Sequence, residues 1–134
     1  MYLVDTNVIS EARKGTKANP GVLKFFKTSE DIYIAAQTIG EIRRGVESIR
    51  HRGDLPQTSR LEKWLDLVVS DYADKILSFD EECAQVWGRL MSPHPEHSID
   101  KQIAAIALIH DLTVVTRNVD DFRGTGVTVK NPFE

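Results

Sequence analysis

Residues 1–10 of the chain read MYLVDTNVIS, and this stretch sets the pattern from which the fold is predicted. A short apolar run at 1–4 ends at Asp5, and the residues after it carry apolar side chains at helical spacing. An apolar run without polar alternation is typical of a strand that is covered on both faces of its sheet. Asp5, Thr6 and Asn7 are all candidates for the cap of the following helix. The stretch therefore predicts a buried strand, an acid at its end and a helix.

The same order of a short apolar run and a longer amphipathic helix continues along the chain. Strands are expected at 1–4, 31–35, 75–79, 112–116 and 127–130, and helices at 8–13, 20–28, 38–49, 58–70, 81–92 and 99–110. Strands that alternate with helices form right-handed crossovers and a parallel sheet. We therefore predict an α/β fold, a three-layer α/β/α domain with a central parallel sheet.

Length and composition restrict the class of protein. With 134 residues, 41% of them hydrophobic and 28% charged, the chain fits a single domain, residues 1–134, with its own core. A single cysteine, Cys83, excludes a disulfide framework and a multi-cysteine zinc site. No apolar stretch has the length of a membrane span and no signal peptide is evident, so we expect a cytoplasmic protein. The net charge of −3 neither indicates nor excludes a nucleic-acid partner.

Acidic side chains follow the predicted strands in regions that are far apart in the sequence. They are Asp5, Glu41, Asp100, Asp120 and Asp121. Ligands of an open parallel sheet bind beyond the carboxyl ends of its strands, and helices that follow strands begin at that edge. Clustered carboxylates repel one another unless a cation or a shared proton compensates. Oxygen ligands select Mg²⁺ or Mn²⁺ over zinc, and such ions suit phosphate substrates.

Each acid taken alone has an ordinary structural explanation. Asp5 would cap a helix, Thr38 and Glu41 have the spacing of a capping box, and Asp100 would favour the positive end of a helix dipole. Their convergence on one edge favours a functional site over these separate explanations. The segment 94–97 (HPEH) carries ligand-type residues, but Pro93 and Pro95 make it a loop, so we expect a solvated connector there.

Four short stretches occur in order: 3–10 (LVDTNVIS), 38–45 (TIGEIRRG), 100–105 (DKQIAA) and 115–122 (VTRNVDDF). They resemble the four motifs of the PIN-domain ribonucleases, particularly the VapC-type toxins of bacterial toxin–antitoxin pairs. Residues 131–133 (NPF) are typical of the branch that includes the trafficking toxin FitB. The resemblance spans nearly the whole chain.

This resemblance implies a PIN fold and an endoribonuclease that depends on Mg²⁺ or Mn²⁺. It implies hydrolysis of RNA phosphodiester bonds with a water activated at an acidic metal site. The same resemblance implies neutralisation by a small cognate antitoxin, a homodimer, and a larger toxin–antitoxin assembly as a further option.

Position in the motifs assigns the catalytic and metal-binding roles. They fall to Asp5, Glu41, Asp100 and Asp121. Some family members carry their fourth acid where this chain has Asn118, so Asn118, Asp120 and Asp121 remain alternatives for that role, with Asp121 preferred. Supporting roles are expected for Thr6, Asn7 and Thr116, whose hydroxyl or amide groups can hold carboxylates by hydrogen bonds. Supporting roles are also expected for Asn118, as a neutral oxygen donor or a group that places a water, and for Asp120, as a substitute for Asp121.

A basic rim must attract RNA to such an acidic pocket. The candidate substrate-binding residues are Arg43, Arg44, Lys101 and Arg117. For each of them a solvated surface position is the alternative. We expect Trp64 and Trp87 to pack in the core, and the apolar faces of residues 22–26 and 61–69 to meet protein partners.

Other classes of protein fit less well. A haloacid-dehalogenase phosphatase needs a second Asp where Asn7 stands, and a receiver domain needs adjacent acids after its first strand. The alternative that stays open is a PIN-like module that binds RNA or a partner without cleaving. The presence of Asp5, Glu41 and Asp100 argues against that alternative, whereas Asn118 and Lys101 depart from the family pattern and keep it open.

Overall fold

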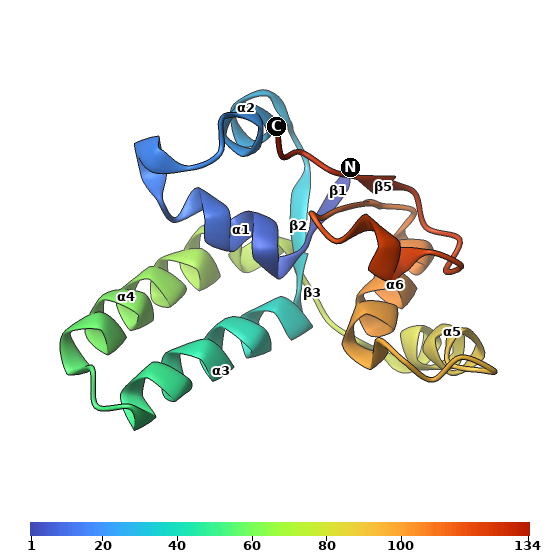
Figure 1. The fold of residues 1–134 in the computed structure, drawn as a ribbon. Helices are drawn as coiled ribbons and strands as arrows, with labels where there is room; N and C mark the ends of the chain where they lie inside the picture. The colour runs from blue at the N-terminus through green and yellow to red at the C-terminus, as the bar shows by residue number, and fades with distance from the viewer.

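The computed structural model describes residues 1–134 and is built on a five-stranded, all-parallel sheet (Figure 1). Its strands are β1 (Tyr2–Val4), β2 (Ile32–Ala35), β3 (Ile76–Leu77), β4 (Thr113–Val115) and β5 (Val129–Lys130). The helices are α1 (Thr6–Ala12), α2 (Pro20–Thr28), α3 (Ala36–His51), α4 (Leu55–Asp71), α5 (Glu81–Leu90) and α6 (Ser98–His110). Three short 3-10 helices, η1 (Gly15–Lys17), η2 (Ala73–Lys75) and η3 (Val119–Phe122), complete the chain. No helix is both long enough and apolar enough to span a bilayer.

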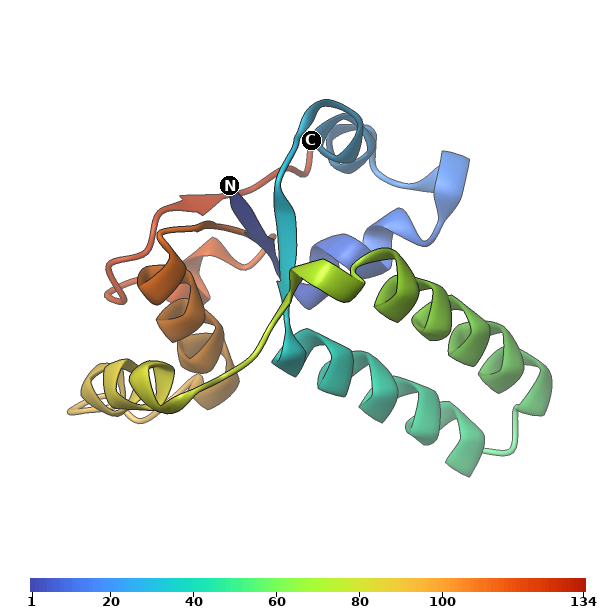
Figure 2. The same ribbon diagram turned by 180° about the vertical axis from the view of Figure 1, so that it is seen from behind.

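Helices cover both faces of the sheet, which confirms the predicted three-layer α/β/α fold (Figures 1 and 2). One apolar cluster joins the sheet to α1–α4 and includes Val8, Phe25 and Leu65. The other joins it to α5, α6 and η3 and includes Ile103 and Phe122. The sheet is therefore buried from both sides, as the continuous apolar sequence of its strands predicted.

The strand order β3-β2-β1-β4-β5 creates a switch point between β1 and β4. The chain builds outward from β1 to β2 and β3, then returns to pair β4 on the other side of β1. In the β1–β4 pair, Val4 lies opposite Val115. The residues after these two strands, Asp5 and Thr116, therefore leave the sheet side by side at its carboxyl edge. This is the position where open α/β sheets bind ligands.

The structure selects among the candidate helix caps and excludes one of them. Asp5, not Thr6 or Asn7, caps α1, because its Oδ1 accepts a hydrogen bond of 2.9 Å from the Thr6 backbone N–H. Thr38 and Glu41 form no capping box, because α3 begins at Ala36 and Thr38 is completely buried inside it. Asp80 caps α5, where its Oδ1 accepts a hydrogen bond of 2.9 Å from the Cys83 backbone N–H.

Helices α3 and α4 form a long hairpin that projects from the sheet (Figures 1 and 2). Arg43 and Arg50 of α3 both donate to the Glu62 carboxylate of α4, at 2.7 and 2.5 Å. Glu47 pairs with the same two arginines. These ion pairs are partly exposed, so each contributes only a few tenths of a kcal/mol to about 1 kcal/mol. Arg43, a predicted substrate-binding residue, is thus engaged within the hairpin together with Arg50.

Phe122 fastens the η3 turn to the core, and its removal should destabilise the fold. The side chain is 2% exposed and packs in the cluster formed with α6. We expect Phe122→Ala to lower the free energy of unfolding by about 3–5 kcal/mol, because it removes buried apolar area and leaves a cavity. The matched control is Val119→Ala in the same turn, where the side chain is 40% exposed and a change within about 0.5 kcal/mol is expected. Urea unfolding followed by circular dichroism measures both, and equal losses would contradict this role of Phe122.

Candidate active site

The carboxylate of Asp5 lies at the centre of the candidate site and is almost completely buried, with 5% exposure. Its Oδ2 accepts a hydrogen bond of 2.8 Å from the Thr116 hydroxyl and a longer one of 3.4 Å from the Asn7 amide. Asn7 also donates to the Thr116 hydroxyl oxygen, at 3.2 Å. The side chains of these two neighbours therefore hold Asp5 in one orientation.

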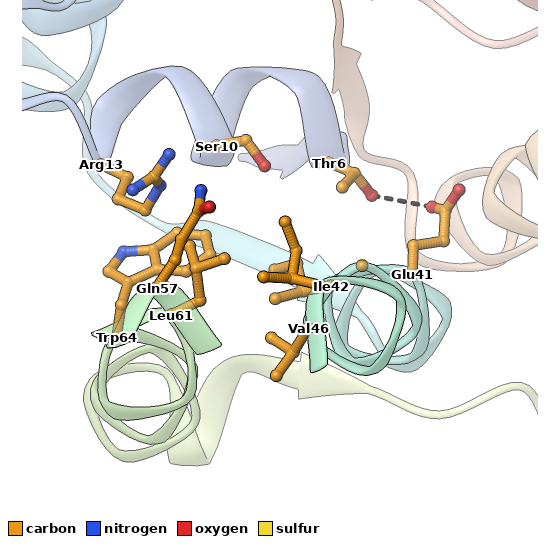
Figure 3. A pocket seen from close by; sticks show the side chains of 11 residues that line it. Thr6, Ser10, Arg13, Glu41, Ile42, Val46, Gln57, Leu61 and Trp64 are labelled. Atoms are coloured by element: carbon orange, nitrogen blue, oxygen red, sulfur yellow. Dashed lines mark hydrogen bonds between the residues drawn. The ribbon is translucent and has the colours of Figure 1, made fainter. Parts of the chain in front are cut away.

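Glu41 joins the site from the first turns of α3. Its Oε1 accepts a hydrogen bond of 2.7 Å from the Thr6 hydroxyl of α1, which Figure 3 shows as a dashed line. Residues 35 positions apart are thereby connected at the edge of the sheet. Because Thr38 makes no capping bond with it, Glu41 is free to face α1.

Asp100 and Asp121 approach the same place from α6 and η3, together with His97. The His97 Nδ1 lies 3.6 Å from an Asp100 oxygen and 3.9 Å from an Asp121 oxygen. One ligand atom of each of these three residues lies within 4.8 Å of the others. His97 was not predicted from the sequence, because the prolines around it indicated a solvated connector. The available signal was its spacing of three residues from Asp100, about one helical turn.

The three candidates for the fourth acidic role have different surroundings. Asp121 faces Asp5 and Asp100 closely enough for its charge to raise the pKa of both carboxyl groups. Asp120 points to solvent and forms a 2.6 Å ion pair with Arg123. Asn118 uses its backbone N–H to donate to the Thr116 hydroxyl, at 3.0 Å. The geometry thus favours Asp121 for the role, which stays a prediction.

Crowded carboxylates make the site electrostatically unfavourable without a compensating charge. Partial burial, together with the charges of Asp5, Asp121 and Glu41, raises the pKa of Asp100 to about 6, and His97 opposes this shift. Burial also raises the pKa of Asp5, although the Thr116 hydrogen bond counteracts it. A bound cation would remove this repulsion, so the donor set fits a hard divalent ion that takes carboxylate oxygens.

The predicted substrate-binding residues differ in their availability. Arg43 is ion-paired with Glu62, whereas Arg44 is exposed and makes no ion pair. Lys101 is only 7% exposed and donates to the His94 carbonyl oxygen, so the alternative of a solvated surface position is wrong for this residue. Arg117 makes no ion pair, and its guanidinium lies over the Phe133 ring, 4.6 Å from the centroid.

A groove of about 300 Å³ runs from the acidic site along α1, between α3 and α4. Figure 3 shows Thr6 and Glu41 at one end and Arg13 and Trp64 at the other. Between them the floor is mainly apolar. Trp64 is half-buried and Arg13 stacks over its ring at 5.8 Å, so this tryptophan packs against the core and also lines the groove.

Comparisons with known proteins identify relatives of the whole chain. A family model of the PIN domain matches residues 2–127. Toxin FitB of Neisseria gonorrhoeae is 34% identical over 143 aligned positions, covering 99% of both chains. VapC ribonuclease Y4jK of Sinorhizobium fredii is 31% identical and covers 100% of this chain and 99% of its own. The crystal structure of FitAcB from Neisseria gonorrhoeae has a TM-score of 0.86 at 33% identity, with 98% of each chain covered.

Neutralising Asp100 should stabilise the metal-free chain, and only at neutral pH. Its pKa of about 6 in the fold exceeds the ordinary 3.8, so the folded chain binds this proton more tightly. The resulting penalty is fully present above pH 6 and disappears as the pH falls through 4. We expect Asp100→Asn to raise the free energy of unfolding at pH 7.5 by about 1 kcal/mol, after allowance for solvent screening of a partly exposed group.

The measurement is urea unfolding in EDTA at pH 7.5 and pH 4. At pH 4 the variant and the unsubstituted chain should be nearly equal, because most of the penalty on the charged carboxylate has then disappeared. Asp120→Asn is the control, since that carboxylate is exposed and its ion pair favours the fold. A destabilising effect of Asp100→Asn at pH 7.5 would contradict the repulsion among these acids.

Proposed function

Because the chain belongs to the PIN-domain family, we propose that it is a divalent-metal-dependent endoribonuclease and the toxin of a toxin–antitoxin pair. The observation that carries this proposal is the convergence of four carboxylates, Asp5, Glu41, Asp100 and Asp121, at the switch point of the sheet. The relatives named as a toxin and as a ribonuclease support the biological role and the reaction.

The metal would be held principally by Asp5 and Asp100, with Glu41 and Asp121 completing the site. A bound Mg²⁺ or Mn²⁺ supplies a lowered pKa for a coordinated water and neutralises charge on the scissile phosphate. Glu41 is exposed and fixed by Thr6, so its free oxygen can orient the attacking water by accepting a hydrogen bond. The hydrogen bonds among Thr116, Asn7 and Asp5 would hold the Asp5 carboxylate in the orientation of a metal ligand.

The surface offers places for the proposed partners. We propose that a cognate antitoxin occupies the groove along α1, because this groove opens directly onto the acidic site. An antitoxin bound there would block access of RNA to the acidic site. A basic side chain of the antitoxin could neutralise part of the charge of the carboxylates. Exposed apolar residues on α2 and α4, namely Leu23, Leu67 and Val69, are available for the homodimer or for a larger toxin–antitoxin assembly. Because cellular RNA is found in the cytoplasm, we propose that the protein acts there.

Cleavage of a structured RNA pool tests the proposed reaction. The chain, purified free of antitoxin, is incubated with the pool in Mg²⁺ or Mn²⁺ and in EDTA, and the ends of the fragments are mapped. We expect cuts at defined positions that disappear in EDTA. Asp5→Asn and Asp100→Asn should each reduce the rate at least about 100-fold, because each removes a proposed metal ligand.

Asp120→Asn provides the matched control, because it changes an acid of the same motif that points away from the site. Its rate should stay within a factor of a few of the unsubstituted chain. Cuts that persist in EDTA would contradict the metal requirement. Divalent-metal binding measured by calorimetry separates the remaining cases: absence of both cleavage and binding would favour a non-cleaving PIN-like module that binds RNA or a partner.

A further inference from the structure

The segment 131–134 lies against the start of α2, where Figures 1 and 2 both show the C-terminus beside that helix. Asn19, the cap of α2, makes two hydrogen bonds to Glu134. Its amide nitrogen donates to the Glu134 carbonyl at 3.0 Å, and its Oδ1 accepts from the Glu134 backbone N–H at 3.0 Å. The same Oδ1 accepts from the Gly21 backbone N–H at 2.9 Å. One side chain therefore ties the closing segment to a helix end.

Gly21 is required for this close approach. It is buried, and a Cβ atom at this position would lie 2.6 Å from the Glu134 Cγ and still closer to the Pro132 carbonyl oxygen. Such an overlap forces the backbone of the segment to move. The other end of the segment is shaped by its own hydrogen bond, in which the Phe133 N–H donates to the Asn131 Oδ1 at 3.0 Å. The NPF sequence thus forms a defined turn on a surface that fits it closely.

The docked turn presents Phe133 to Arg117. The guanidinium lies 4.6 Å from the ring centroid, at a distance typical of a cation–π contact. Arg117 is also fixed at its backbone, whose N–H donates to the Asn7 Oδ1 at 3.0 Å, and Asn7 contacts Asp5. This arginine is therefore attached directly to the group of residues that orients the central carboxylate.

Arg117 stays available for a ligand, whereas two neighbouring cations do not. Lys14 pairs with Glu11 at 2.9 Å, and Arg123 pairs with Asp120 at 2.6 Å. Arg117 makes no ion pair, and Glu11 interacts with it only at longer range. An aromatic ring fixes the guanidinium without neutralising its charge, so the planar group keeps N–H donors for a phosphate.

We propose that residues 131–134 form a strap that positions Arg117, through Phe133, to bind a phosphate of the RNA substrate. This inference rests on the proposed ribonuclease function and adds a positioning role for a segment outside the acidic site. The strap supplies part of the attraction that the acidic pocket lacks.

RNA binding in an Asp5→Asn background tests the strap without the complication of cleavage. A fluorescently labelled RNA from the cleaved pool is titrated at several salt concentrations. Arg117→Ala should weaken binding about 10-fold, and the slope of log affinity against log salt should become shallower by about 0.7, the value for one phosphate contact on a single strand. Phe133→Ala should weaken binding about three-fold, and Phe133→Tyr should restore it, because the tyrosine ring keeps the cation–π contact.

Two glycine variants separate the strap from a general loss of structure. Gly21→Ala leaves Arg117 and Phe133 chemically intact but displaces the segment, so it should reproduce the loss seen with Phe133→Ala. Gly88→Ala is the matched control, since its Cβ would meet no atom within 4 Å, and RNA affinity should not change. Thermal unfolding is recorded for every variant, and the comparison uses those that melt within a few degrees of the parent.

The outcomes distinguish failure of the strap from failure of the proposed function. If Arg117→Ala weakens binding while Phe133→Ala and Gly21→Ala do not, the positioning role of the strap is overturned. If Arg117→Ala leaves both affinity and salt slope unchanged, the phosphate contact is overturned. RNA cleavage is also measured in the chain that keeps Asp5. There, the same variants should raise the KM for RNA more than they lower kcat. If that chain does not cleave RNA but the variants weaken binding as expected, the proposed nuclease activity is overturned and the positioning role of the strap stands.

Discussion

The parallel pairing of β1 with β4 is the constraint on which the rest of the site depends. It places Asp5 and Thr116 side by side, and the 2.8 Å hydrogen bond between them partly offsets the cost of burying a carboxylate. Without that pairing, two residues 111 positions apart would have no reason to meet. The polar groups of Asn7 and Asn118 then attach to the same hydroxyl, so one threonine organises both ends of the chain around a single acid.

Hydrophobic packing holds the acids together against their mutual repulsion. Asp100 is carried by a helix whose inner face is completely buried, and Asp121 precedes Phe122, which packs in the same cluster. The core thus stabilises an arrangement that electrostatics alone would open. The raised pKa of Asp100 reflects this conflict, because the carboxyl group can relieve it only by taking up a proton or by sharing a cation. A divalent ion bound to these carboxylates would relieve their repulsion, in agreement with the proposed metal site.

The fold was predictable from the sequence because the signals for it are local. Continuous apolar runs marked the strands, and 3.6-residue periodicity marked the helices, within a few residues at most ends. Features that depend on tertiary contacts could not be predicted in this way. Thr38 and Glu41 have capping-box spacing, yet α3 begins two residues earlier and buries the threonine. Similarly, nothing local shows that Lys101 turns inward to the His94 carbonyl, or that His97 reaches two acids from different elements.

The distribution of positive charge explains how an acidic site and a net charge of −3 are compatible with the proposed RNA substrate. Pairing within the α3–α4 hairpin engages Arg43 and Arg50, so these cations stabilise structure and contribute little field at the site. Arg117 differs because its partner is an aromatic ring, which orients a guanidinium and leaves its charge intact. Attraction for a polyanion therefore depends less on the number of arginines than on which of them lack a carboxylate. In this fold that distinction is made by what each arginine packs against.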